Sequence, residues 1–284
     1  MTNDDAAGLT AWRRAREERL LAPDAWLAVA GLDWLAEGLN TVGSAPGSAV
    51  KLPEGAAPAQ VAALELDAGR LTLTPAPGVE IFCADQPVQG SLALEIAAEQ
   101  GQSAAIRIGR LSLYALRREN LFGVRVYDPQ NPARLNFGGL AWFPPDPAWR
   151  VEAQFVAEHT TLPIVNMLGQ TEQAACPGYA EFEAAGRSLR LYPLGEMGAG
   201  ELLWFIFRDQ TAGESTYPAG RYLWADPPQA GRMTLDFNRA YNPPCAYTPH
   251  ATCPLPPAQN RLPIAVTAGE KYPPLSVSPH SLSK

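Results

Sequence analysis

Short apolar segments separated by Gly and Pro fill most of the sequence from Trp26 onward, and they constrain the fold more than any other feature. Runs of this length, bounded by turn residues, are typical of β-strands. The short spacings between them favour antiparallel meanders. The sequence therefore predicts a mainly β protein. Its predicted strands include residues 64–66, 71–73, 106–116, 124–127, 202–207, 222–224 and 233–237.

The N-terminal segment, residues 1–23, is predicted to contain a helix from residue 10 to residue 21. Thr10 is a residue type that caps helices, and Trp12 and Ala15 fall at helical spacing. Pro23 ends the helix because proline cannot continue the hydrogen-bonding pattern. One face is rich in Arg, but Glu residues dilute its charge, which favours a solvated face over a membrane or partner surface.

Residues 24–127 carry short motifs in a recognisable order: GLNTVGS at 38–44, VKLP at 50–53 and ALELDAGRLTL at 63–73. This order resembles the forkhead-associated (FHA) fold, a β-sandwich in which a motif ending in Gly-Arg precedes a strand. The sequence departs from that family at Ser44, where a phosphate-contacting Arg is expected, and it has no Ser-x-x-His loop between residues 53 and 64. The resemblance therefore implies a sandwich without phosphothreonine binding. A generic β-sandwich with one tight turn at residues 38–43 is the alternative.

A stretch of turn-forming residues at 127–132, YDPQNP, is the predicted linker to a second domain. That domain, residues 128–284, is predicted to be an antiparallel β-sheet or barrel with a long Pro-rich loop. Its residues 202–207 form a continuous apolar run, as expected for a strand buried on both faces.

The Pro-rich loop lies within residues 236–271, which include six prolines between Pro243 and Pro257. A loop of this length inside a compact domain is usually functional or disordered. Apolar anchors such as Phe237 and Tyr241 argue against disorder. We therefore expect a rigid loop that builds a functional site.

The strand predicted before this loop ends in three polar residues. In an alternating strand, Asp236 and Asn238 share one face, and Arg239 follows them. A carboxylate, an amide and a guanidinium together can orient a polar ligand. Alternatively, they hydrogen bond to the loop backbone and hold the loop in place, because an irregular loop leaves many carbonyls in need of donors.

Two cysteines in the loop, Cys245 and Cys253, are separated by seven residues. Zinc knuckles need two to four residues between ligands, so this spacing does not predict a zinc site. Three interpretations remain open: two structural thiols, a disulfide or redox pair, or a nucleophile whose pKa is lowered by His250.

Two further segments contain polar residues with open roles. At residues 208–222, Asp209 and Thr211 are suited to an Asx-type turn, although Thr216, Tyr217 and Arg221 could instead line a pocket. Near the C-terminus, Glu270 and Lys271 form either an acid and base pair or an exposed ion pair.

Composition and missing motifs exclude several functions. The formal net charge of -7 disfavours nucleic acid as a partner. There is no apolar signal core and no apolar run of about 18 residues, so the sequence predicts a cytoplasmic protein with reduced thiols and no membrane partner. The serine-hydrolase GxSxG, the GxxxxGK phosphate loop and the zinc-protease HExxH motifs do not occur. No metal site is predicted, and no particular cofactor is indicated.

Specific motifs are spread over nearly the whole chain: WL at 26–27, GLDWL at 31–35, GLN at 38–40, TYPAGRYL at 216–223, DFNRAYNPPCAYTPHATCPLPP at 236–257, NRLP at 260–263 and AGEK at 268–271. Together they resemble the family of domain of unknown function 1684 (DUF1684). The resemblance implies a bacterial origin. It supplies no activity, because the family is functionally uncharacterised.

The predicted function is the binding of a small polar or anionic molecule in a C-terminal pocket, where Arg supplies fixed donors and Asn and Asp set orientation. A hydrolase-type enzyme that uses a cysteine or a carboxylate of the same pocket is the first alternative. A protein-interaction scaffold that uses the β-sandwich edge is the second. The predicted rim consists of Asp236, Asn238, Arg239, Asn242, Tyr247, Asn260 and Arg261, and the candidate reactive residues are Cys245, Cys253, Glu270 and Lys271.

Overall fold

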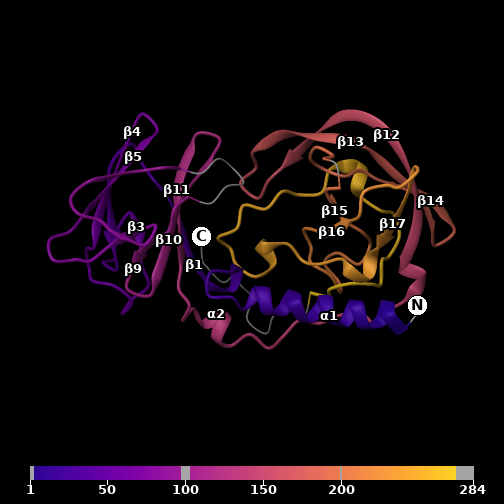
Figure 1. Cartoon of the computed structure of the whole chain (residues 1–284), viewed down its shortest axis with the longest axis horizontal. Coiled ribbons are helices and arrows are strands. Elements are labelled where there is room, and N and C mark those ends of the chain that lie inside the picture. Colours follow the sequence, from indigo (N-terminus) through magenta and orange to yellow (C-terminus); the bar gives the residue numbers. More distant parts are fainter. Residues whose placement is uncertain (1–2, 97–102, 199, 273–284) are drawn as a thin grey trace. The chain divides into compact units, whose positions relative to one another are not determined.

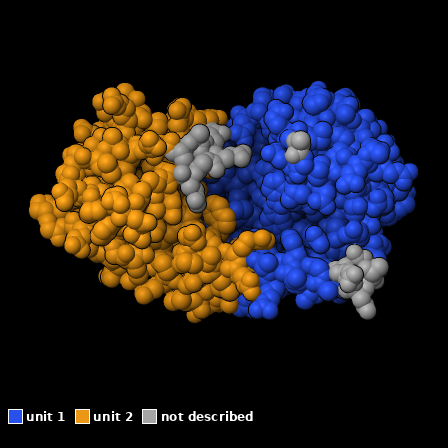
Figure 2. All heavy atoms as spheres, in the orientation of Figure 1, with its two compact units in different colours: residues 1–17, 138–284 blue, residues 18–137 orange. Residues whose placement is uncertain are grey.

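The computed structural model describes residues 3–96, 103–198 and 200–272 (Figure 1). Strands predominate, which confirms the predicted mainly β fold class. The chain groups into two compact units, coloured separately in Figure 2: unit 1 comprises residues 1–17 and 138–284, and unit 2 comprises residues 18–137. The predicted boundaries after residues 23 and 127 stay predictions. Residues 273–284 of the predicted C-terminal domain lie outside the described residues.

The predicted N-terminal helix is present as α1 (Asn3–Leu20), and it begins before the predicted start. Thr10 does not cap it: the hydroxyl donates to the carbonyl of Ala6 at 2.9 Å, one turn back inside the helix. The division between the units falls within this helix, so that residues up to Glu17 belong to unit 1.

Unit 2 contains two sheets, in which the described strand pairs are antiparallel except for β2 and β3. The six-stranded sheet has the order β1 (Val29–Trp34), β11 (Leu121–Tyr127), β10 (Leu111–Arg118), β9 (Ile106–Ile108), β6 (Phe82–Cys83) and β7 (Gln86–Pro87). The five-stranded sheet has the order β3 (Val50–Lys51), β2 (Gly38–Gly43), β4 (Ala62–Asp67), β5 (Arg70–Pro75) and β8 (Leu92–Leu94). Short helices η1 (Trp26–Ala28) and α2 (Pro132–Leu135) flank the first sheet in sequence.

Residues 38–43 form strand β2, so the alternative prediction of a single tight turn there is wrong. The turn lies just before the strand and is held by the buried Asn40. Its amide nitrogen donates to the carbonyls of Ala36 at 2.8 Å and Gly38 at 3.0 Å, and its oxygen accepts from the Ala36 amide at 2.9 Å. Asn40 therefore fixes the connection between β1 and β2.

The two sheets of unit 2 share one apolar core, which makes this unit a β-sandwich. Alternating residues of β4 and β5, such as Leu64 and Leu73, pack in the same buried cluster as Leu113 and Val124 of the other sheet. The closer resemblance to the FHA fold stays a prediction. Ser44, at the position where that family has Arg, donates its hydroxyl to the carbonyl of Ala57 at 2.9 Å.

Unit 1 is also built from antiparallel sheets, and in its described part neither sheet closes into a barrel. The larger sheet has the order β14 (Arg187–Leu191), β13 (Thr171–Ala184), β12 (Arg150–Val165) and β17 (Arg232–Asp236). The smaller one pairs β15 (Leu203–Phe207) with β16 (Arg221–Ala225). Single turns of 3-10 helix lie at η2 (Pro147–Trp149), η3 (Phe237–Arg239), η4 (Pro244–Ala246) and η5 (Ala258–Asn260).

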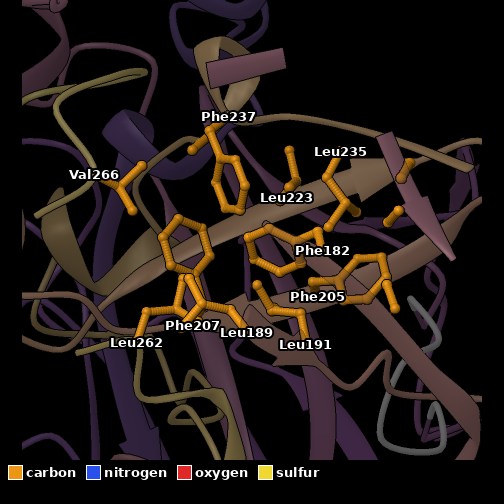
Figure 3. Close-up of a cluster of buried hydrophobic side chains, with 14 of the residues drawn as sticks. Phe182, Leu189, Leu191, Phe205, Phe207, Leu223, Leu235, Phe237, Leu262 and Val266 are labelled. Carbon is orange, nitrogen blue, oxygen red and sulfur yellow. The ribbon is translucent and has the colours of Figure 1, made fainter. Parts of the chain in front are cut away.

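The small ribbon β15–β16 is apolar on both faces, as predicted for residues 202–207. Phe205 and Phe207 belong to one buried cluster (Figure 3), whereas Ile206 and Tyr222 belong to another. Phe237, which is fully buried, packs in the first cluster with its ring centroid 5.4 Å from that of Phe207. Truncating a buried Phe to Ala typically costs about 3–5 kcal/mol, so this anchor fixes the start of the Pro-rich segment.

Candidate functional site

The Pro-rich segment begins differently from the predicted alternating strand. Strand β17 ends at Asp236, and residues 237–239 turn as η3, so Asp236 and Asn238 do not share a strand face. They still touch, because the carboxylate of Asp236 accepts from the backbone and side-chain nitrogens of Asn238 at 3.1 and 3.0 Å. A short polar side chain at the start of a helical turn commonly accepts backbone N–H groups in this way.

A close backbone approach places Glu270 against the start of this segment. Gly269 has a φ of +80°, and a Cβ on this residue would lie 2.5 Å from the carbonyl oxygen of Ala240 and 2.8 Å from that of Phe237. The amide of Glu270 then donates to the Ala240 carbonyl at 2.8 Å. Only glycine fits this position without strain, and its presence brings the Glu270 side chain beside Asn242.

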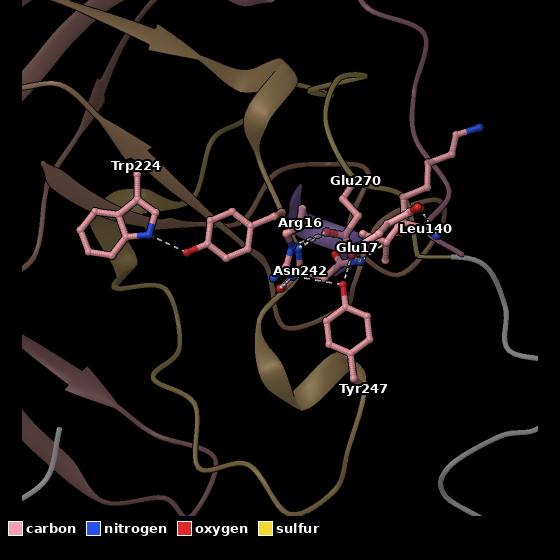
Figure 4. Close-up of polar contacts among 9 residues, drawn as sticks. Arg16, Glu17, Leu140, Trp224, Asn242, Tyr247 and Glu270 are labelled. Atoms are coloured by element: carbon pink, nitrogen blue, oxygen red, sulfur yellow. Dashed lines mark hydrogen bonds and ion pairs between the residues drawn. The ribbon is translucent and has the colours of Figure 1, made fainter. Parts of the chain in front are cut away.

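Three side chains meet around the Glu270 carboxylate, and we call Arg16, Asn242, Tyr247 and Glu270 together the Glu270 cluster (Figure 4). Arg16, from α1, pairs with the carboxylate at 3.4 Å and donates to the Asn242 carbonyl at 2.9 Å and the Tyr247 hydroxyl at 3.2 Å. The Asn242 side chain donates to the carboxylate at 2.8 Å, and the Tyr247 hydroxyl also hydrogen bonds to it. The cluster joins the N-terminal helix to the C-terminal AGEK motif.

Burial controls the electrostatics of this cluster. Glu270 is fully buried, and loss of hydration raises the pKa of its carboxyl above the usual value although Arg16 lowers it. Burial, followed by the nearby Glu270, also raises the pKa of the Tyr247 hydroxyl. The predicted exposed ion pair of Glu270 and Lys271 is therefore wrong. Glu270 is buried against Arg16, and the ammonium of Lys271 lies 4.8 Å from the ring centroid of Phe143.

Asn242 has an acceptor that the cluster does not use. Its side-chain nitrogen donates both to Glu270 and to the carbonyl of Lys271, at 2.8 and 3.0 Å, which fixes the orientation of the amide. Its Oδ1 is buried and has no hydrogen-bond partner among the described residues. Asn242 as a whole is 2% exposed. Buried side-chain acceptors are normally paired, so this atom calls for a donor from beyond the described residues.

An aromatic surface adjoins the Glu270 cluster. The guanidinium of Arg16 lies 4.6 Å from the ring centroid of Tyr241, whose hydroxyl accepts from the indole N–H of Trp224 at 2.7 Å (Figure 4). Trp224 stacks on Trp204 with centroids 5.8 Å apart and is 46% exposed. Tyr241 thus connects a buried polar cluster to an accessible indole.

The two loop cysteines lie together. The amide of Cys245 donates to the Sγ of Cys253 at 3.2 Å, and the Tyr217 hydroxyl donates to the Cys245 carbonyl at 2.8 Å. His250 uses its backbone amide to bond the Thr248 hydroxyl at 3.3 Å. Among the described residues, no three His, Cys, Asp or Glu side chains cluster closely enough to hold a metal ion.

The other predicted rim residues have different surroundings. Asp236 pairs with Arg150 at 3.4 Å and with Arg239 at 3.6 Å. Asn238 accepts from the amide of Asp146 at 2.9 Å and donates to its carbonyl at 2.9 Å. These contacts hold the turn at η3, whereas Asn242 and Tyr247 belong to the Glu270 cluster.

Asn260 is fully buried and hydrogen bonds to the backbone: its side chain accepts from the Tyr192 amide and donates to the carbonyls of Tyr192 and Ile206 at 2.8–2.9 Å. Arg261, the next residue, is exposed and lines an open groove of about 500 Å³. A second groove of about 490 Å³ lies over β12, β13 and β17 and is lined by Val151, Glu152, Ala153, Gln154, Glu181, Phe182, Glu183, Ser188 and Arg232.

The 208–222 segment hydrogen bonds to residues 264–268, which lead to Glu270. The predicted Asx-type turn is confirmed, since Asp209 accepts from the Thr211 amide at 3.4 Å and from its hydroxyl at 2.8 Å. Arg221 is fully buried, pairs with Asp209 at 3.3 Å and donates to the carbonyls of Val266, at 2.9 Å, and Ala268. It therefore supports the stretch that leads to Glu270 and does not line an open pocket.

Sequence reasoning missed Arg16 and Trp224. Arg16 belongs to the face of α1 that the sequence assigned to solvent, yet its side chain is only 12% exposed and takes part in the cluster. The only signal for it was the basic excess of that face. Trp224 lies in a predicted strand, and nothing in its alternation indicated that the indole remains exposed.

The comparisons with known proteins name a family but no activity. Residues 135–271 match the family model described as "Protein of unknown function (DUF1684)". A similar solved structure is the solution NMR structure of an uncharacterized protein of Haloarcula marismortui, which is 37% identical; the match covers 49% of this chain and 78% of that one, with a TM-score of 0.41. No curated protein matches the chain. No helix in the described residues is long and apolar enough to cross a membrane.

Proposed function

We propose that unit 1 binds a small polar ligand at the Glu270 cluster. The chain belongs, through residues 135–271, to the DUF1684 family of proteins of unknown function. The ligand donates a hydrogen bond from a hydroxyl or amine group to Oδ1 of Asn242. The exposed face of Trp224, joined to the cluster through Tyr241, offers it an aromatic contact. The proposal follows the predicted binding of a small polar molecule in the C-terminal half.

The observation that carries this proposal is the buried Oδ1 of Asn242, which has no hydrogen-bond partner in the described part of the chain. A neutral acceptor left unpaired in a buried site costs about 1–3 kcal/mol. Both hydrogens of the same amide are already used by Glu270 and Lys271. Flipping the amide would break these two bonds, so the acceptor needs a donor that the described residues do not supply.

The charges around the cluster favour a ligand that also carries an acidic group. Arg13 donates to the Phe143 carbonyl at 3.1 Å, and the Lys271 ammonium lies over the ring of the same Phe143. Arg16 pairs with Glu270 and Arg13 faces Asp236, so the Lys271 ammonium is the cation that would meet an acidic group of the ligand. Small hydroxy acids and amino acids combine the required donor with a negative charge.

Thermal melting across a panel of small hydroxy acids, amino acids and polyols tests the proposal. A ligand present at about 100 times its Kd stabilises the folded protein by about 2.7 kcal/mol, which corresponds to a rise in Tm of about 2–4 °C per kcal/mol for a domain of 150–250 residues. Asn242→Ala should abolish the rise. Asn260→Ala is the matched control, because it also removes a buried amide but should keep the rise.

The role of the Lys271 charge is tested separately with Lys271→Met. This variant should show a smaller rise in Tm with acids but an unchanged rise in Tm with polyols. Lys51→Met, which removes an exposed lysine of unit 2, should change neither. The proposal fails if no compound of the panel shifts the wild type, or if Asn242→Ala keeps the full shift.

The hydrolase alternative has one observation in its favour. Glu270 is a buried carboxyl with a raised pKa that hydrogen bonds to Tyr247, and a group of this kind can transfer a proton in acid–base catalysis. Turnover of ester and amide substrates by the wild type, lost in Glu270→Gln, would support it. Equal turnover by both proteins would reject it.

A further inference from the structure

A second reactive group, outside the Glu270 cluster, lies at Cys245 and Cys253. The amide of Cys245 donates to Sγ of Cys253 at 3.2 Å, which places the Cys253 sulfur against the backbone of Cys245. Disulfide formation requires side chains that point at each other across a short distance. Both cysteines are free thiols, and the 3.2 Å contact holds the Cys253 sulfur next to the residue that carries the second thiol.

The two thiols differ in access and acidity. Cys245 lies in η4 and is half-buried, whereas Cys253 is buried, with 6% of its surface exposed. The hydrogen bond from the Cys253 thiol lowers the pKa of Cys245 and outweighs the effect of burial. The same hydrogen bond and burial raise the pKa of Cys253. The thiolate, which is the form that attacks oxidants, is therefore favoured at the more accessible Cys245.

We propose that Cys245 and Cys253 form a peroxide-oxidisable pair, in which Cys245 reacts first and Cys253 converts the product into a disulfide. The geometry supports this order, because an oxidant reaches the half-buried Cys245 first and the sulfur of the buried Cys253 lies against the Cys245 amide.

The chemistry is a two-electron oxidation of two thiols by hydrogen peroxide. The Cys245 thiolate attacks one peroxide oxygen, an S–O bond forms, the O–O bond breaks, and the departing hydroxide takes up the proton that Cys245 released. The Cys253 sulfur then attacks the sulfenic sulfur, the S–S bond forms and the S–O bond breaks. The second hydroxide takes the Cys253 proton, so that one peroxide yields one disulfide and two waters.

The disulfide would close the loop that carries Tyr247, a member of the Glu270 cluster. The thiol pair is nevertheless an independent site, since its contacts do not involve Asn242 or Glu270. The proposed oxidation therefore stands or falls separately from the proposed ligand binding.

The test uses the full chain, reduced and freed of reductant, then treated with hydrogen peroxide and analysed by alkylation, proteolysis and peptide mass. The wild type should lose two alkylatable thiols, and the missing pair should map to Cys245 and Cys253. Cys176→Ser, which removes a buried thiol that donates to the Gly178 carbonyl at 3.1 Å, should behave like the wild type. In Cys253→Ser, dimedone should label Cys245 after peroxide treatment.

The proposal is overturned if peroxide leaves all four thiols alkylatable, or if the disulfide that forms includes Cys83 or Cys176. Dimedone labelling of Cys253 in Cys245→Ser at the rate found for Cys245 would contradict the assigned order. The mapping of the wild type needs no variant, so the result does not depend on how a substituted protein folds.

Discussion

Gly269→Ala should destabilise unit 1 more than the same change at a glycine that has free space around its Cβ position, because Gly269 combines two constraints. Its φ of +80° is a left-handed conformation, which costs an L-residue about 1–2 kcal/mol. The added Cβ would also lie 2.5 Å from the Ala240 carbonyl oxygen and 2.8 Å from that of Phe237. Both atoms belong to the backbone and cannot rotate away, and forcing such an overlap typically costs about 1–3 kcal/mol.

The sum is an expected loss of about 2–5 kcal/mol in the free energy of unfolding. Gly213→Ala is the matched control, since Gly213 has a φ of +88° and, apart from its neighbours in the chain, no atom lies within 4 Å of the position that a Cβ would take. Gly213→Ala should lower the free energy of unfolding only by the cost of the left-handed backbone conformation, about 1–2 kcal/mol. Urea unfolding of the two variants and the wild type measures both losses, and thermal melting should rank them in the same order.

The difference between the two variants isolates the close approach that places Glu270. Equal losses for Gly269→Ala and Gly213→Ala would show that the segment around residue 269 does not pack against residues 237–240, and the position of Glu270 would then be wrong as well. A larger loss in Gly213→Ala would refute the reasoning outright.

Three further predictions concern other parts of the chain. Burial raises the pKa of Glu270 above its usual value of 4.5. The protonated carboxyl therefore stabilises the fold fully below pH 4.5, and this stabilisation is lost as the pH rises through the raised pKa. Urea unfolding over this pH range should show a fall in the free energy of unfolding of the wild type that Glu270→Gln lacks. Arg239→Ala should lower the free energy of unfolding by less than about 1 kcal/mol, because its ion pair with Asp236 is partly exposed, and a drop of many degrees in Tm would contradict this. Residues 24–127 should show no specific phosphothreonine binding because Ser44 stands where Arg is expected, and phosphate-dependent binding from a peptide library would disprove it.

Apolar residues were predicted well because their burial follows from their chemistry alone. Phe205, Phe207 and Phe237 are all fully buried, and the predicted run at 202–207 is buried on both faces from Phe205 to Phe207, whereas Leu202 at its start is 49% exposed. The mainly β class follows from the same patterns. Strand ends were predicted less well. Strand β17 stops at Asp236, where the chain turns into η3. The alternation of apolar and polar residues continues past this point, so the sequence pattern does not show where the strand ends.

Polar residues were harder to assign, since the sequence does not show which partner a side chain reaches. The predicted rim came from one continuous segment, but Asn260 turns inward to the backbone of Tyr192 and Ile206, while Arg261 beside it is exposed. The most informative partner of Glu270 is Arg16, which lies 254 residues away in sequence. Such a contact follows from the packing of α1 and from no local pattern.

The most direct measurement is a high-resolution crystal structure of the protein purified from its native host, inspected at Asn242. Binding at the Glu270 cluster predicts density for a small molecule with a donor atom at about 2.7–3.2 Å from Oδ1 and with Arg16, Tyr247 and Glu270 in the contacts described above. A structure in which Oδ1 is satisfied by a side chain or by ordered water alone would contradict the proposed function.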